Sequence, residues 1–302
     1  MCELCVTFRR ELRLNRGGDQ PPLFHISLER RFIHHIGETM ELLEECKLCG
    51  KSAVLQNSHI IPRSYYKRLK RESNQLVVIV DSDEIEPRLS NSDPKEKLLC
   101  TECEQFLSVK YESYGTKIFR TSKNVIKQDD RITINGFDYK RFYLYFISIL
   151  WRASLTSNDN FKSIALGGEF EDLLKFCIIN NRMKLGRGNS LRIDHFLRLS
   201  VARVVDSSNN ISDDMIKNVM MNFRMDKSNI EKVAIFYLML EGFLIVYYLS
   251  PGKDIHDVRA RRIQYQIVNG SSANIMKIEI GELKVIREMF NLAINKSKKH
   301  HQ

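Results

Sequence analysis

Four cysteines form two Cys-x-x-Cys pairs that lie about fifty residues apart in the chain. The first pair is Cys46 and Cys49, and the second is Cys100 and Cys103. A structural zinc ion takes four ligands in a tetrahedron, and thiolates are among the ligands it prefers. No stretch typical of an export signal opens the chain, so disulfides are disfavoured and paired cysteines favour a metal. We therefore predict that these four cysteines bind one zinc ion.

A histidine and a run of basic residues lie between the two cysteine pairs. His59 stands ahead of Pro62 in "NSHIIPR", and the segment "RSYYKRLKRE" comes next. A neutral imidazole can take a proton from water, so His59 is a candidate general base, with a structural histidine as the alternative. The basic run can lie along a phosphate backbone, or it can be a solvated helix face. Its cations are Arg63, Lys67, Arg68, Lys70 and Arg71.

The second cysteine pair opens a segment whose pattern predicts a helix from about Glu102 to Tyr114. Glu104, Ser108 and Glu112 are spaced i, i+4 and i+8, so they share one face of that helix. Two carboxylates and a hydroxyl on one stripe can hold a hard divalent cation such as Mg²⁺ or Mn²⁺. A solvated polar stripe is the alternative interpretation.

In this order and spacing, the segment resembles the HNH, or ββα-metal, nucleases in their zinc-stapled form. The stretches "CKLC", "SHIIP" and "KLLCTECE" match successive parts of the family pattern. The resemblance implies a small zinc-stapled ββα-metal domain, with His59 as the base that activates water and Glu104 as a ligand of the catalytic divalent ion. Ser58 stands where the family usually has an acidic or histidine ligand. Lys95 falls near the place of the family's central Asn.

A wider resemblance joins both halves of the chain. The combination of "SHIIP", "LLCTECEQFLSVKYE" and "FISILWRASLTS" is similar to a group of bacterial proteins associated with phage defence and mobile elements. It implies an endonuclease that cleaves DNA, with RNA the less favoured substrate, and a protein partner in a defence complex is compatible with it. The alternative is a catalytically inactive zinc module that binds nucleic acid or a protein as a sensor or adaptor.

Composition agrees with a polyanionic partner and with a protein that does not enter the membrane. The 302 residues carry 47 basic and 37 acidic side chains, so the formal net charge is 47 − 37 = +10. This excess favours nucleic acid, with a generally basic surface as the alternative. The longest apolar run, residues 233–249, is divided by Glu241 and Gly242 into halves too short to span a bilayer. We predict a β-hairpin that turns there, and a cytoplasmic protein.

The fold class predicted from these patterns is α+β, in three parts. They are a basic N-terminal arm and helix over 1–45, a zinc-binding HNH-like domain over 46–120, and a larger mixed α/β domain of unknown topology over 121–302. Cys2 and Cys5 form a third pair without evident partners. The helix of the first part runs from about Leu28 to Glu45. The further predicted elements are a strand at 76–80, a buried helix at 139–155, short elements at 169–179 and 195–205, strands at 261–268 and 274–280, and a closing helix within 281–299.

Overall fold

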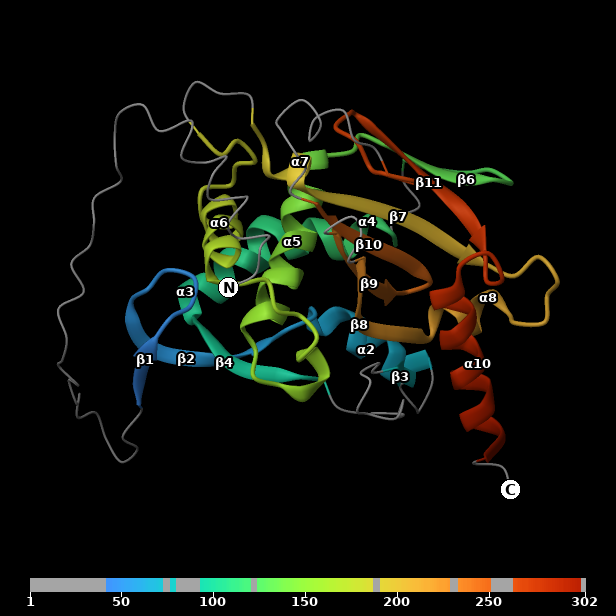
Figure 1. Cartoon of the computed structure of the whole chain (residues 1–302), viewed down its shortest axis with the longest axis horizontal. Coiled ribbons are helices and arrows are strands. Elements are labelled where there is room, and N and C mark those ends of the chain that lie inside the picture. Colours follow the sequence, from blue (N-terminus) through green and yellow to red (C-terminus); the bar gives the residue numbers. More distant parts are fainter. Residues whose placement is uncertain are drawn as a thin grey trace.

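The computed structural model describes residues 42–72, 77–79, 93–120, 124–186, 191–228, 233–250 and 263–299. These residues form a mixed α and β fold, which confirms the predicted class at that level (Figure 1). The strands are β1 (Leu43–Glu45), β2 (Ser52–His59), β3 (Val77–Ile79), β4 (Lys95–Cys100), β5 (Val125–Lys127), β6 (Arg131–Asn135), β7 (Leu197–Val205), β8 (Val219–Ser228), β9 (Val233–Leu240), β10 (Phe243–Leu249) and β11 (Ser272–Glu279). The helices are α2 (Arg63–Glu72), α3 (Thr101–Leu107), the π-helical turn η1 (Ser108–Glu112), α4 (Ser113–Ile118), α5 (Tyr139–Leu155), the short 3₁₀ turn η2 (Asp159–Phe161), α6 (Gly168–Ile179), α7 (Ile193–Phe196), α8 (Asp213–Lys217) and α10 (Lys284–Lys299).

The smaller of two sheets contains the cysteine pairs. Its strand order is β1-β2-β4, and both pairings are antiparallel. The first cysteine pair lies on the turn between β1 and β2, where Gly50 adopts a positive φ of 75° that a glycine tolerates. The second pair lies where β4 passes directly into α3. Strand pairing therefore brings the two cysteine pairs to the same end of the small sheet.

The larger sheet has eight strands in the order β3-β8-β9-β10-β7-β11-β6-β5. Its centre is the β9–β10 hairpin, whose strands are rich in aromatic and β-branched residues. The turn residues Glu241 and Gly242 both have positive φ, as a two-residue hairpin turn requires. β3, which comes after the basic helix α2 in the chain, pairs in parallel with β8 at the edge of this sheet. The cysteine-rich segment thus contributes a strand to the larger sheet.

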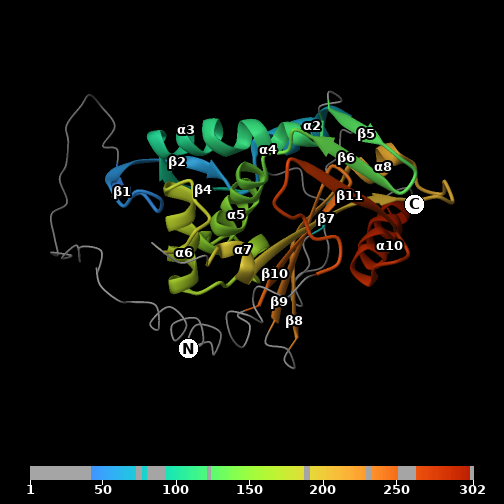
Figure 2. The same cartoon turned by 90° about the horizontal axis from the view of Figure 1, so that it is seen from above.

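Helices cover the two faces of the larger sheet. α5 and α6 lie on one side, and α10 lies on the opposite side (Figure 2). α5 is apolar on nearly every side, so it is buried along most of its length. Its N-terminus is capped by Asp138, whose side chain accepts a hydrogen bond from the backbone N–H of Arg141 at 2.9 Å. α5 is therefore a fixed support for the groups that project from it.

Most elements predicted from the sequence are confirmed. α5 covers the residues predicted for the buried helix, and β9 and β10 turn at the predicted residues 241 and 242. The predicted helix near 102–114 is present as α3, η1 and α4, with a π-helical turn in its middle. β3, α6, β7, β11 and α10 lie at their predicted places. Long and strongly patterned segments were therefore predicted well.

Two predictions of secondary structure are wrong. The helix predicted to end at Glu45 does not include Leu43–Glu45, which form β1 because they pair with Ser52–Val54. The rest of that helix, and Cys2 and Cys5, lie outside the described residues. No strand forms over residues 263–268, the described part of the predicted strand at 261–268. Tyr265 there has a positive φ of 55°, and Gln266 makes only an isolated bridge to Ser200.

One apolar core joins the cysteine-rich segment to the larger sheet. A single cluster of buried side chains includes Leu55, Ile60 and Leu107 from that segment, Trp151 from α5 and Ile245 from β10. The boundary predicted at residues 120 and 121 therefore does not separate two independent cores. The described part of the chain contains no helix with the length and apolar composition needed to cross a bilayer.

Candidate functional site

The four predicted zinc ligands come together at the end of the small sheet. The sulfur atoms of Cys46, Cys49, Cys100 and Cys103 all lie within 4.8 Å of one another. Cys49 Sγ and Cys100 Sγ are 3.8 Å apart. Zinc–sulfur bonds of about 2.3 Å in a tetrahedron place two sulfurs about 3.8 Å apart. The residues present therefore fit a structural zinc ion.

Backbone hydrogen bonds hold the two cysteine turns against each other. The N–H of Lys47 donates to the Leu98 carbonyl at 2.9 Å, and the N–H of Gly50 donates to the Cys46 carbonyl at 2.8 Å. The N–H of Cys100 donates to Cys46 Sγ at 3.3 Å. The first turn is thus closed on itself and tied to the strand that carries the second pair. This arrangement presents the sulfurs without relying on the metal alone.

The sulfurs differ in how readily they ionise without a metal. Burial raises the pKa of the Cys46 thiol, but backbone N–H groups that donate to it lower that pKa by more, to about 7. Burial dominates at Cys100 and raises its pKa to about 11. Burial also raises the pKa of Cys103. A cation bound to the four sulfurs offsets these costs because zinc binds the deprotonated form.

His59 lies at the end of β2, and its imidazole has a carboxylate partner. Its Nε2 is 3.0 Å from Oδ2 of Asp93, a residue just ahead of β4. Lys95 is the cross-strand neighbour of His59, and its Nζ is 3.5 Å from the same carboxylate oxygen. The His59 side chain is 19% exposed, so another molecule can reach it. The hairpin of β2 and β4 therefore assembles an imidazole, a carboxylate and an ammonium group.

The surroundings of His59 favour a neutral ring with a defined tautomer. Burial lowers the pKa of His59 below its ordinary value, and this effect outweighs Asp93, which raises it. Lys95 and Arg63 lower that pKa further. An ionised carboxylate only accepts hydrogen bonds, so Nε2 donates to Asp93 and Nδ1 keeps its lone pair. The ring can thus accept a proton at Nδ1.

Arg152 connects the helix α5 to both sides of this site. The side chain is 1% exposed. Its Nη1 donates to the backbone carbonyl of His59 at 2.9 Å, and its Nη2 donates to Oε1 of Glu112 at 2.8 Å. Its Nε lies 3.3 Å from the Ser148 carbonyl within the same helix. The buried ion pair expected for Arg152 is therefore present, and its partner is Glu112.

The predicted carboxylate stripe is divided between different partners. Glu112 is paired with Arg152, whereas Oε1 of Glu104 is buried and has no hydrogen-bond partner within the described residues. The Ser58 hydroxyl donates to the Gln56 carbonyl at 3.4 Å. Among the described residues, the four cysteines are the one group of three or more potential ligand side chains in close contact. His59, Glu104 and Glu112 do not form a second group of that kind.

A hard divalent cation therefore has a partial donor set here. Glu104 offers a buried carboxylate oxygen that no hydrogen bond satisfies within the described residues. Such an oxygen fits a cation, because a buried acceptor left unpaired is unfavourable. Glu112 is engaged by Arg152 and does not offer the same freedom. Of the two predicted carboxylate ligands, Glu104 is the one that fits.

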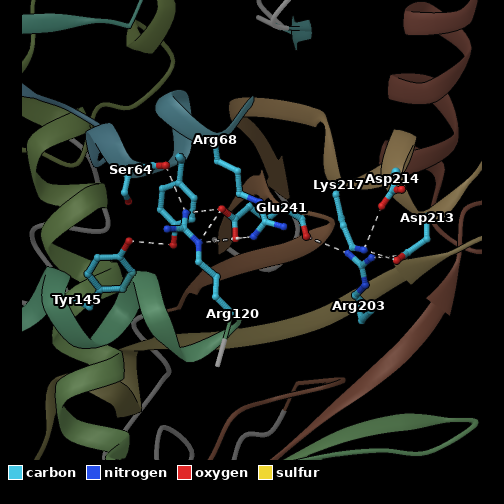
Figure 3. Close-up of polar contacts among 10 residues, drawn as sticks. Ser64, Arg68, Arg120, Tyr145, Arg203, Asp213, Asp214, Lys217 and Glu241 are labelled. Carbon is cyan, nitrogen blue, oxygen red and sulfur yellow. Dashed lines mark hydrogen bonds and ion pairs between the residues drawn. The ribbon is translucent and has the colours of Figure 1, made fainter. Parts of the chain in front are cut away.

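The basic run lies on α2, directly after His59 in the chain. Arg63 and Lys67 are exposed there. Arg68 is instead drawn toward the larger sheet, where its Nη1 is 3.6 Å from Oε2 of Glu241 (Figure 3). The side chains of Lys70 and Arg71 lie outside the described residues. Two of the five predicted cations thus face solvent, and a third is turned to an internal partner.

Glu241 at the hairpin turn gathers charged groups from separate elements (Figure 3). Arg120 donates to both of its carboxylate oxygens, with Nε at 2.9 Å from Oε1 and 3.0 Å from Oε2. Nη1 of Arg203 donates to the Glu241 backbone carbonyl at 2.9 Å. The Glu241 side chain is buried. This turn is therefore an ionic junction between α2, the end of α4 and the sheet.

Sequence reasoning missed Asp93 and gave Arg152 no functional weight. Asp93 stands in "DPKEKLLC", and an Asp-Pro step was interpreted only as a loop. A charged residue in the apolar helix "FISILWRAS" was the available signal for Arg152, because a buried charge needs a partner. Neither partner could be identified, since both contacts join residues far apart in the chain.

Comparison with known proteins yields no relative that assigns this site. No family model, curated protein or solved structure matches the chain.

Proposed function

We propose that this chain is a zinc-stapled, metal-dependent HNH-like nuclease that cleaves DNA phosphodiester bonds. The observation that carries the proposal is the position of His59, which has Asp93 against Nε2 and leaves Nδ1 free beside the basic helix α2. Two antiparallel strands and then a helix, with cysteines at both joints, are consistent with a small zinc-stapled ββα unit. In this proposal, zinc fixes the hairpin and helix and takes no part in the reaction.

The hydrolytic step depends on the tautomer of His59. Nδ1 accepts a proton from a water molecule as the water oxygen forms a bond to phosphorus. The bond from phosphorus to the leaving oxygen breaks, and that oxygen takes a proton from solvent. Asp93 stabilises the imidazolium that forms, because its carboxylate stays hydrogen-bonded to Nε2. When bound at Glu104, a divalent cation supplies charge stabilisation for the phosphate and the leaving oxygen.

The cations around His59 are suited to hold the flanking phosphates. Lys95 lies on the same hairpin as the imidazole, and the exposed Arg63 and Lys67 lie on the helix directly after it. Such contacts position a nucleic acid without reading its bases. The net charge of +10 supports association with a polyanion.

A nicking assay on supercoiled plasmid tests the proposal directly. The zinc-loaded full chain is incubated with Mg²⁺ or Mn²⁺, and we expect nicked and linear products. His59→Ala should lower the cleavage rate by about 10²-fold or more, because general-base catalysis contributes on that scale. Asp93→Asn should lower the rate by less. Asp130→Asn is the matched control, since Asp130 is an exposed carboxylate paired with Arg131 outside this site. Cleavage that is equally fast in His59→Ala would remove His59 from the mechanism.

One observation favours a second function, a zinc module that binds nucleic acid or a protein without cutting. Ser58 replaces an expected ligand, and Arg152 engages Glu112. In that case plasmid DNA binds the chain but stays intact with every divalent cation tested. Binding that weakens in Arg63→Gln and Lys67→Gln, with no cleavage in the wild type, would support this alternative.

A further inference from the structure

We propose that Arg152 is a positioning residue that holds His59 in place from the helix α5. This inference rests on the proposed function, because it concerns how the candidate base is presented. It assigns a task to the segment "FISILWRASLTS", which otherwise has no role in the site.

The first argument is the set of atoms that Arg152 joins. Nη1 donates to the backbone carbonyl of His59 at 2.9 Å, so the contact fixes the main chain that carries the imidazole. Nη2 donates to Glu112 at 2.8 Å, on the helical segment after the second cysteine pair. The guanidinium therefore bridges the strand and the helix between which the site lies. Three of its nitrogen atoms are engaged, counting the longer contact of Nε with Ser148.

The second argument is the geometry that only an arginine provides. A planar guanidinium presents several donors in fixed directions, whereas a lysine ammonium is a single flexible point. Arg152 is 1% exposed, so solvent does not compete for these contacts. Burying such a charge is costly unless it is paired and hydrogen-bonded, and Glu112 supplies that pairing. The position is therefore occupied by a costly group that does a specific geometric task.

The third argument is a second contact between the same end of α5 and the hairpin. Thr156 and Ser157, which come directly after the last residue of α5, both donate to the carboxylate of Glu96. The Ser157 N–H also donates to Glu96 Oε2 at 2.8 Å. Glu96 is the cross-strand partner of Ser58, the residue before His59. One helix end thus holds both strands at the level of the imidazole.

The rigidity of α5 makes these contacts effective. The helix is buried in the core, and the hydroxyl of Tyr247 on β10 donates to the carbonyl of Phe146 at 3.0 Å. The orientation of His59 is therefore set by the larger sheet through α5. A displacement of α5 would move the backbone of His59 with it.

Arg152→Lys in the zinc-loaded full chain tests the inference, with Arg141→Lys as the matched control. Arg141 is on the first turn of the same helix and also donates to backbone carbonyls, those of Lys110 and Val109. The first readout is the ¹⁵N chemical shifts of the His59 ring, assigned with His59→Ala. We expect the Nε2–H tautomer in the wild type and in Arg141→Lys, and a mixture of tautomers in Arg152→Lys. The second readout is plasmid cleavage, in which Arg152→Lys should lower kcat about tenfold or more and leave KM unchanged.

A paired variant covers the case in which Arg152→Lys does not fold. Arg152→Met combined with Glu112→Gln removes both charges, so that no buried charge is left unpaired. It leaves the His59 carbonyl without its donor, and Glu112→Gln alone is its control. Folding is verified by bound zinc and circular dichroism.

The outcomes separate this inference from the proposed function. If the wild type does not cleave DNA but the His59 signals change only in the Arg152 variants, the nuclease proposal fails and the positioning task stands. If the ring signals and kcat are the same in a folded Arg152 variant as in its control, the positioning task is overturned. A KM increase without a change in kcat or in the ring signals would likewise overturn it.

Discussion

At the scale of single residues, the pair of His59 and Asp93 decides what the site can do. The carboxylate alone would raise the pKa of the imidazole, but burial lowers it by more. The result is a ring that is neutral near pH 7 and still has a partner able to stabilise its protonated form. Burial and charge thus act in opposite directions on the pKa and in the same direction on the chemistry.

The pH dependence of cleavage should reflect this balance. The base is active when neutral, and its pKa lies below the ordinary value of 6.5, so the rate should stay level as the pH falls to 6.5 and decline only below it. Asp93 raises that pKa, so Asp93→Asn should move the acid limb to still lower pH while reducing the maximal rate. Lys95 and Arg63 act against Asp93, and Lys95→Gln should move the limb upward. Initial rates from pH 5 to 8 check this, and an acid limb above pH 6.5 in the wild type would contradict it.

The cysteines illustrate how far residue types and spacing carry a prediction. Two Cys-x-x-Cys pairs were enough to predict one four-sulfur cluster, because each turn can direct two sulfurs at one point. Glu104 and Glu112 were predicted to act together from helical spacing alone. That spacing did not reveal Arg152, which comes from another helix and engages Glu112.

At the scale of elements, the β9–β10 hairpin contributes a buried charge as well as the centre of the sheet. Glu241 occupies a turn position with a positive φ of 50°, which is uncommon for a residue with a side chain. A Cβ atom at Gly242 would overlap the guanidinium of Arg203, so glycine is required there for space as well as for conformation. The hairpin was predictable from its apolar halves, but the ionic role of its turn was not, since Arg120 and Arg68 approach from distant segments.

Loss of the Glu241 charge should weaken the attachment of α2 to the sheet. Glu241→Gln leaves Arg120 and Arg68 without this carboxylate, and we expect the free energy of unfolding to fall by about 1–3 kcal/mol. Chemical denaturation of the zinc-loaded chain measures this change. Glu279→Gln is the control, because Glu279 also accepts hydrogen bonds from another residue, Ser207, but at an exposed site. Equal stability of the Glu241→Gln variant and the wild type would show that the junction contributes little.

At the scale of the whole molecule, the zinc-binding segment and the larger sheet share one core. Tyr65 of α2 accepts a hydrogen bond from Tyr145 of α5 at 2.9 Å, and Tyr111 of η1 donates to the Ile178 carbonyl of α6 at 2.6 Å. All three tyrosines are buried. The sequence indicated two cores because the cysteine pairs mark a segment of their own. Chain-distant packing between apolar helices gives no comparable local signal.

This shared core makes a prediction for the isolated segment. A fragment of residues 42–120 contains all four cysteines and should bind one zinc ion. It lacks α5 and α6, so the apolar side chains that pack against them would be exposed, and we expect no cooperative thermal transition. Circular dichroism melting with and without zinc checks this expectation. A sharp, zinc-dependent transition in the fragment would instead establish an independently folding domain.

The π-helical turn at Ser108–Glu112 has a consequence for how this chain tolerates changes in length. A π turn holds more residues than an α turn, and the helix on either side of it is in register with its neighbours only because of that surplus. Deleting one residue there would rewind the turn to regular α geometry and rotate the downstream helix by about 100°. Tyr111, Glu112 and α4 would then face away from α6, Arg152 and the hairpin junction together, so a single codon sets the phase between the zinc end of the helix and the rest of the protein.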